Sequence, residues 1–231
     1  MKKFYFLFGG IAAIGIGLVG YNVGSSVFGD AVSAPIVLEL ENDEALVALA
    51  QGVMKGDPDA PLTIMEFGDY QCPGCGAFAL SVKPRLEADY VASGQARFVF
   101  YDFPLYSIHP HAFLAARAAR CAGDQDKFWE YHETLFRNQA RWSGEATLGG
   151  TLSDYADELD LDMGDFNACV NSDKYADVVS ANLELGMRMG VQSTPTVLVQ
   201  ANGMLRKVAT FDYNTIVSAI EIVTSDGPGS N

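Results

Sequence analysis

The motif Cys72-Pro73-Gly74-Cys75 constrains the fold more than any other feature of this 231-residue sequence. It follows residues 62–68 (LTIMEFG), a short apolar segment between proline and glycine that predicts a buried strand. Proline suits the first position of a helix, so a helix is expected to begin at the motif, with a disturbance at Pro84, and to end before Gly94. A second strand is predicted over residues 97–103 (RFVFYDF). Together these elements form a βαβ unit with both cysteines at the start of its helix.

The rest of the chain divides into a helical block and a terminal ββα segment. Helical periodicity and glycine or aspartate breaks predict five helices, over residues 110–121, 125–138, 152–159, 163–171 and 175–189. The period then changes to a strand over 196–200, a two-residue hairpin turn at Asn202-Gly203, a strand over 205–210 and a helix over 213–223. The order predicts an α/β fold interrupted by an all-helical subdomain at about 107–189.

The N-terminal segment predicts export from the cytoplasm. Lys2 and Lys3 precede seventeen residues, 4–20, that carry no charge. This length lies between the ~7–15 residues of a secretory hydrophobic region and the ~20 of a spanning helix. With the lysines held inside, the remaining chain is delivered outside. We favour an uncleaved signal anchor over residues 1–23; the alternatives are a cleaved signal peptide, which leaves a soluble protein, and a buried core helix.

Three further boundaries follow from turn chemistry and composition. Residues 24–35 are typical of a linker, and residues 36–54 predict a helix, so 24–55 form one N-terminal unit. The turn-rich segment 56–61 then opens the main domain, which is expected to span 56–223. Residues 224–231 (TSDGPGSN) are expected to be a flexible tail.

The two cysteines of the motif are suited to dithiol–disulfide chemistry. Two intervening residues at a helix start let the sulfurs reach each other, and the helix N-terminus should lower the pKa of the Cys72 thiol. Cys75, one turn further in, would be shielded and act as the resolving thiol. A zinc site with His109 and His111 as the best additional ligands is one alternative. A structural disulfide is another, although bridging two residues restrains little of the unfolded chain.

Two other positions are candidates for the same site. Glu66 lies within the predicted buried strand, where a carboxylate is costly unless it is paired or functional, and could relay a proton to or from Cys75. The alternative is a strand-edge carboxylate that reaches solvent. Thr194-Pro195 comes just before a strand, where a cis proline would present the Thr194 backbone to an extended substrate peptide. The alternative there is an ordinary trans proline.

Several segments together resemble the DsbA-like branch of the thioredoxin superfamily. They are EFGDYQCPGC, FPLYSIHPHAFLAARAARCA, KFWEYHETLF, FNAC and GVQSTPTVLV, and the similarity covers roughly residues 55–223. The resemblance implies a thioredoxin fold with a helical insertion, Cys72 as nucleophile and Cys75 as resolving thiol. It also implies that Thr194-Pro195 is the cis-proline loop and Glu66 the buried acid. Strongly oxidising members carry Pro-His between the cysteines where this chain has Pro73-Gly74, so the direction of electron flow stays open.

The remaining two cysteines are expected to pair with each other. Cys121 and Cys169 both lie in the helical block, 48 positions apart. In an oxidising compartment they are natural partners, and closing a loop of this length stabilises by roughly 4 kcal/mol in the chain-entropy model. Two buried free thiols, or a second redox pair that relays electrons to Cys72 and Cys75, are the alternatives.

The first hypothesis is therefore an extracytoplasmic disulfide oxidase that passes the Cys72–Cys75 disulfide to cysteine-containing exported proteins. A membrane redox partner would reoxidise the dithiol, and no bound cofactor or metal is needed because the sulfurs carry the chemistry. The formal net charge of −14 argues against nucleic-acid binding, since an acidic body repels phosphates. The alternatives are a reductase or isomerase that uses the same dithiol, and a non-catalytic peptide-binding chaperone.

Overall fold

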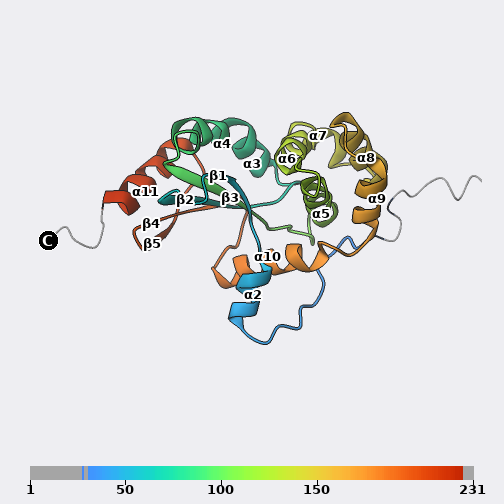
Figure 1. Ribbon diagram of the computed structural model, residues 1–231, viewed down its shortest axis with the longest axis horizontal. Coiled ribbons are helices and arrows are strands. Elements are labelled where there is room, and N and C mark those ends of the chain that lie inside the picture. Colours follow the sequence, from blue (N-terminus) through green and yellow to red (C-terminus); the bar gives the residue numbers. More distant parts are fainter. Residues whose placement is uncertain (1–27, 29–30, 226–231) are drawn as a thin grey trace, which may run out of the picture.

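The computed structural model describes residue 28 and residues 31–225, which build a five-stranded sheet with helices on both faces (Figure 1). The strand order is β1-β3-β2-β4-β5; β2 runs parallel to β3, and the other neighbours are antiparallel. The strands are β1 (Val53–Gly56), β2 (Leu62–Gly68), β3 (Ala96–Asp102), β4 (Thr196–Ala201) and β5 (Met204–Lys207). The predicted βαβ, helical block and ββα order is confirmed.

The helix that begins at the cysteine motif covers one face of the sheet. It is continuous but changes its hydrogen-bonding period, through α3 (Pro73–Ala77), the π-helical turn η1 (Phe78–Val82), α4 (Lys83–Leu86) and a second π-helical turn η2 (Glu87–Val91). Pro84 cannot donate a backbone hydrogen bond, which explains why the predicted disturbance takes the form of a π-helical turn just before it. Helix α11 (Tyr213–Ser225) packs on the same face, where its buried residues join one hydrophobic core with those of this helix.

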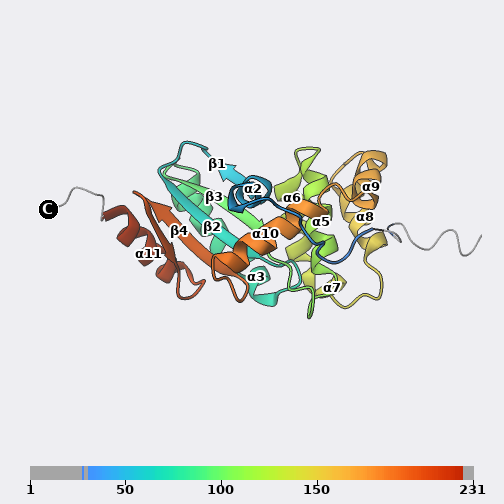
Figure 2. The same cartoon turned by 90° about the horizontal axis from the view of Figure 1, so that it is seen from below.

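Helix α10 (Ala176–Arg188) covers the opposite face, crossing beneath the strands (Figure 2). Successive side chains of a strand point to opposite faces, and β2 shows this alternation clearly. Ile64 packs into the core under the motif helix, whereas Met65 and Phe67 pack with Leu183 of α10. The alternation therefore places Glu66 on the same face as the cysteine motif.

The helical insertion leaves the sheet after β3 and forms its own cluster beside the motif helix (Figure 1). Its helices are α5 (Ala112–Gly123), α6 (Phe128–Arg137), α7 (Gln139–Trp142), α8 (Gly149–Glu158) and α9 (Met163–Asn171). The core of this cluster is continuous with the core of the sheet, and α5 is buried along almost its whole length. The insertion was predicted at about 107–189, a range that includes α10. Because α10 lies against the sheet, the extent of the insertion stays a prediction.

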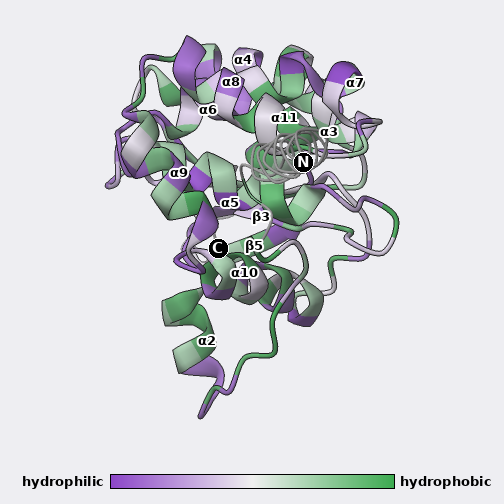
Figure 3. Ribbon diagram, turned by 90° about the vertical axis from the view of Figure 1, so that its right-hand side faces the viewer, coloured by the Kyte–Doolittle hydropathy of each residue, from purple (hydrophilic) through white to green (hydrophobic). Residues whose placement is uncertain are grey.

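The predicted helix over residues 36–54 is wrong at both ends. Residues 35–40 are irregular, and the helix is the short α2 (Asp43–Leu49), which Asn42 caps by accepting from the Ala45 N–H at 2.8 Å. Helix α2 lies beyond α10 at the edge of the molecule, where Leu46 is buried (Figure 3). Residues 53–56, partly expected in this helix, form β1 instead, because hydrogen bonding to β3 outweighs local helix propensity.

The predicted membrane segment, residues 1–23, lies outside the described residues. Within the part of the chain that the structure describes, the helices are too short or too polar to cross a membrane. At the other end, α11 extends to Ser225, so the first two residues of the expected tail are helical. The hairpin turn at Asn202-Gly203 is confirmed, with φ values of 51° and 77° that glycine and asparagine adopt most readily.

Candidate active site

The two motif cysteines lie at the start of α3 in different environments. Cys72 is the N-cap residue, with φ −72° and ψ 120°, and Pro73 occupies the first turn as the sequence predicts. Cys72 is half-buried and Cys75 fully buried, and both are free thiols in this structure. Cys72 is therefore the accessible thiol of the pair, and Cys75 is the shielded one.

The environments shift the pKa values of the two thiols in opposite directions. The pKa of Cys72 falls from 9.0 to about 5 because the Cys75 thiol hydrogen-bonds to its sulfur, assisted by Thr194 and by the backbone N–H groups of Gly74 and Cys75. Burial opposes this shift. Burial raises the pKa of Cys75 well above its usual value, and its bond to Cys72 and the charge of Glu66 add to the rise. At neutral pH the site therefore holds a thiolate at Cys72 and a thiol at Cys75.

The loop before β4 faces the cysteine pair. The Thr194–Pro195 bond is cis, and Cys72 Sγ lies 3.3 Å from the Thr194 carbonyl oxygen, to which the cysteine donates when it is protonated. Gly74 lies against the same loop, since a Cβ added there would come within 3.1 Å of Pro195 Cδ. The structure thus brings together residues that are about 120 positions apart in sequence.

Glu66 is fully buried on β2, below the motif helix. Neither carboxylate oxygen has a hydrogen-bond partner among the described residues. Burial raises the pKa of Glu66 to about 8, opposed by the ammonium group of Lys83 and assisted by the charge of Cys72. The strand-edge alternative for Glu66 is therefore wrong, because the side chain has no exposure to solvent.

Residues of the helical insertion hold the segment that leads into the motif. Gln139 of α7 donates through Nε2 to the carbonyls of Tyr70 and Cys72, at 2.7 and 2.9 Å. Gln71 donates to the Ser143 carbonyl at 3.0 Å. These contacts fix the start of α3 from the side of the insertion.

The other residues considered from the sequence lie apart from the two sulfurs. Cys121 and Cys169 form a disulfide that joins α5 to α9. His132 is buried among aromatic rings, with Nδ1 3.0 Å from the Tyr70 hydroxyl, and burial holds its pKa well below the usual value. His111 contacts the Glu145 carbonyl at 2.8 Å. Among the described residues, no cluster of three or more His, Cys, Asp or Glu side chains could hold a metal ion.

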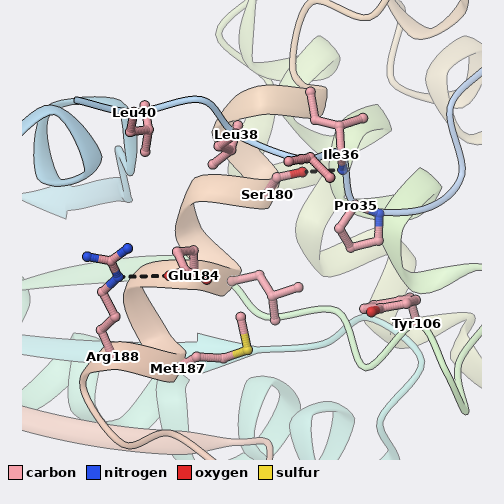
Figure 4. Close-up of a pocket in the computed structure, with 11 residues that line it drawn as sticks. Pro35, Ile36, Leu38, Leu40, Tyr106, Ser180, Glu184, Met187 and Arg188 are labelled. Atoms are coloured by element: carbon pink, nitrogen blue, oxygen red, sulfur yellow. Dashed lines mark hydrogen bonds and ion pairs between the residues drawn. The ribbon is translucent and has the colours of Figure 1, made fainter. Parts of the chain in front are cut away.

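A pocket of about 430 Å³ lies on the α10 side of the sheet (Figure 4). It is bounded by residues 35–38 and Leu40 on one side and by side chains of α10 on the other. The Ile36 N–H donates to Ser180 Oγ at 3.0 Å and fastens the N-terminal segment there. Neither cysteine of the motif lines this pocket.

A dithiol at a helix start, facing a cis-proline loop on a mixed sheet with an inserted helical cluster, defines a thiol–disulfide oxidoreductase with a thioredoxin-like fold. Residues 49–220 match the model of the thioredoxin family, and the chain belongs to that family. The resemblance to its DsbA-like branch is confirmed by the relatives and solved structures described next.

Disulfide bond formation protein D of Bacillus subtilis (strain 168) is 29% identical over 177 residues, covering 74% of this chain and 78% of that protein. The crystal structure of oxidised BdbD from Bacillus subtilis superposes with a TM-score of 0.67 and 28% identity, covering 85% of this chain and 99% of that one. Wolbachia pipientis alpha-DsbA1, at 21% identity and a TM-score of 0.64 over 82% and 94% of the chains, shares the fold.

A second kind of relative matches over only part of its length. Na(+)/H(+) antiporter NhaA 1 of Salinispora arenicola (strain CNS-205) is 34% identical over 146 residues. The match covers 63% of this chain but 21% of the antiporter.

Sequence reasoning missed several residues that support the site. Lys83, whose ammonium group opposes the rise in the pKa of Glu66, sits about two helical turns beyond Cys75 in a segment that predicted only helix. Gln139 and Asp69 are polar residues next to predicted helix or strand ends, where polar residues are common. One sequence signal could have identified Asp69 as a site residue: it lies directly after a predicted buried strand and just before the motif.

Proposed function

We propose that this protein is an extracytoplasmic disulfide oxidase that passes the Cys72–Cys75 disulfide to cysteine-containing exported proteins. The observation that carries the proposal is the lowered pKa of Cys72, about 5. Stabilising the thiolate stabilises the reduced form, and a pair whose reduced form is stabilised accepts electrons more readily. The similarity to disulfide bond formation protein D supports the same direction.

In the proposed reaction a substrate thiolate attacks Cys72 Sγ of the disulfide. A bond forms between the substrate sulfur and Cys72, the Cys72–Cys75 bond breaks, and its electron pair passes to Cys75. The second thiolate of the substrate then attacks the substrate sulfur of this mixed disulfide. Cys72 leaves as a thiolate, the substrate carries a new disulfide, and the protein holds two electrons more than before.

Glu66 is proposed to supply the proton that Cys75 needs. The raised pKa of Cys75 makes its thiolate a poor leaving group unless it is protonated as the disulfide opens. Glu66, with a pKa of about 8, holds a proton at neutral pH and lies buried on the sheet face beneath the motif helix.

Thr194-Pro195 is proposed to bind the substrate backbone, with Pro73 and Gly74 setting the reduction potential of the pair. Cys121–Cys169 is proposed to be structural.

Location and partners form the remaining part of the proposal. Residues 1–23 are proposed to anchor the protein in the inner membrane, or to be removed as a signal peptide, with 24–55 as linker and 56–223 as the catalytic domain. A membrane redox partner is proposed to reoxidise the dithiol, because each turnover leaves the protein reduced. The mass of the exported protein distinguishes the two: an anchor is retained in the mature chain, whereas a cleaved signal peptide is missing from it.

The decisive experiment measures the equilibrium reduction potential of the Cys72–Cys75 pair in glutathione buffers, with mass spectrometry assigning each cysteine. An oxidase is expected to lie near about −120 mV, where DsbA lies. A value near about −270 mV, like thioredoxin, would instead indicate an electron donor. Loss of a defined two-electron transition at this pair would contradict dithiol chemistry altogether and favour a peptide-binding role.

A further inference from the structure

Asp69 touches both cysteines of the site through its backbone. It follows β2 directly, and its N–H donates to Cys75 Sγ at 3.3 Å. Its carbonyl accepts from the Cys72 N–H at 3.1 Å. One residue outside the motif therefore contacts the accessible cysteine and the shielded one at the same time.

The carboxylate of Asp69 is what holds this backbone in place. The side chain is 0% exposed, and its oxygens accept three hydrogen bonds. Oδ1 accepts from the Gln71 N–H at 2.7 Å; Oδ2 accepts from the Leu105 N–H at 2.7 Å and lies 2.8 Å from His109 Nδ1. A buried carboxylate is costly without such donors, and here each oxygen has at least one.

The three donors come from two separate parts of the fold. Gln71 belongs to the segment that enters the motif, whereas Leu105 and His109 lie between β3 and α5, where the chain enters the helical insertion. The carboxylate thus ties the entry of the insertion to the segment that carries the cysteines. The His109 side chain is 19% exposed, so one of the three partners of the carboxylate is accessible from the surface.

We infer that Asp69 is a positioning residue of the dithiol: anchored through its carboxylate to Leu105 and His109, it holds its own N–H on the Cys75 sulfur. That contact orients Cys75 so that its thiol can donate to the Cys72 sulfur, which stabilises the reduced pair. The inference rests on the proposed dithiol chemistry but not on the direction of electron flow.

Asp69→Asn tests the inference in the full-length protein. The amide cannot accept from both the Leu105 N–H and the Gln71 N–H, so the segment loosens and the Cys75 contact weakens. The equilibrium with glutathione is expected to shift about three- to tenfold toward the oxidised protein, the size of one hydrogen bond. The pKa of Cys72, followed by thiolate absorbance, is expected to rise.

Asp102→Asn is the matched control. Asp102 is also buried, at 1% exposed, and its side chain pairs with Arg120 at 2.5 Å, not with the motif. This variant is expected to lose stability while its glutathione equilibrium and Cys72 pKa stay at the wild-type values. The control separates loss of a buried carboxylate from loss of the contact to Cys75.

Two results would overturn the inference. An Asp69→Asn protein with unchanged equilibrium and unchanged Cys72 pKa would make Asp69 merely structural. A lowered Cys72 pKa would show that Asp69 acts as a nearby negative charge, which opposes the thiolate.

If Asp69→Asn fails to fold, His109→Ala removes one donor from a partly exposed position. The same shift, smaller in size, is then expected, and no shift counts against the inference. Absence of a two-electron transition in the wild type would reject the proposed function instead.

Discussion

The low pKa of Cys72 results from neighbours at the start of α3 and in the loop before β4. The Cys75 thiol, Thr194 and two backbone N–H groups stabilise its thiolate and outweigh the burial that opposes it. A lowered folded pKa means that ionisation stabilises the folded, reduced protein. This contribution is complete above the ordinary pKa of 9.0 and is lost as the pH falls through about 5.

The alkylation rate of the reduced protein is therefore expected to rise with a midpoint near pH 5. Cys75→Ala removes the hydrogen bond that contributes most, so its midpoint is expected to move up by about one to two pH units. Both are measured by stopped-flow reaction with a neutral alkylating reagent and mass assignment of Cys72. A wild-type midpoint near that of a free cysteine would contradict the thiolate assignment.

Glu66 shows the opposite shift, because burial disfavours its charge. Its folded pKa of about 8 lies above its ordinary 4.5, so the carboxyl group lowers stability increasingly as the pH rises from 4.5 to 8. Glu66→Gln, which cannot ionise, is expected to be more stable than the wild type by a few kcal/mol at pH 8 and above, and nearly equal below pH 4.5. Chemical denaturation across this pH range measures the difference.

The same variant tests the proposed proton transfer. Without the carboxyl group, oxidation of a dithiol peptide at pH 7 is expected to slow about 100-fold, in the range of general acid catalysis. A rate equal to that of the wild type, in a folded Glu66→Gln protein, would remove Glu66 from the proposed mechanism.

At the scale of elements, the contact between α3 and α7 requires a glycine. A Cβ at Gly76 would come within 2.8 Å of Gln139 Oε1, while the Gln139 amide group holds the Tyr70 and Cys72 carbonyls. Gly76→Ala is expected to cost about 1–2 kcal/mol, because it displaces Gln139 from two hydrogen bonds. In a Gln139→Ala background the same change is expected to be neutral or mildly stabilising, since alanine favours the helix. Equal costs in the two backgrounds, measured by denaturation, would show that Gln139 does not need this space.

At the scale of the whole molecule, the Cys121–Cys169 disulfide joins two helices of the insertion away from the site. Replacing both cysteines with alanine is expected to lower the free energy of unfolding by about 4 kcal/mol, from the 48-residue separation. The potential of the Cys72–Cys75 pair is expected to stay unchanged. A shifted potential or slower turnover would support a second redox pair, the alternative kept open from the sequence.

The sequence predicted the elements whose signals are local. A glycine in the hairpin turn, a proline at the helix start and a short apolar run between proline and glycine each act through neighbouring atoms, so Asn202-Gly203, the start of α3 and β2 were predicted correctly. The helix expected over 36–54 failed at its C-terminal end, because residues 53–56 are held by pairing with β3, a partner more than 40 positions away. A strand of this kind has no strong local signal.

The sequence by itself determined which two cysteines lie together at the start of a helix, the βαβ frame that presents them and the order of the helical block. Motif spacing and hydrophobic periodicity are sufficient for these conclusions. Only the tertiary structure decided how the sulfurs are tuned, because pKa values depend on burial and on atoms from distant segments. The unpaired carboxylate of Glu66, the Thr194 carbonyl at Cys72 and the Asp69 contacts arise because the end of β2, the start of β4 and the entry to α5 lie together.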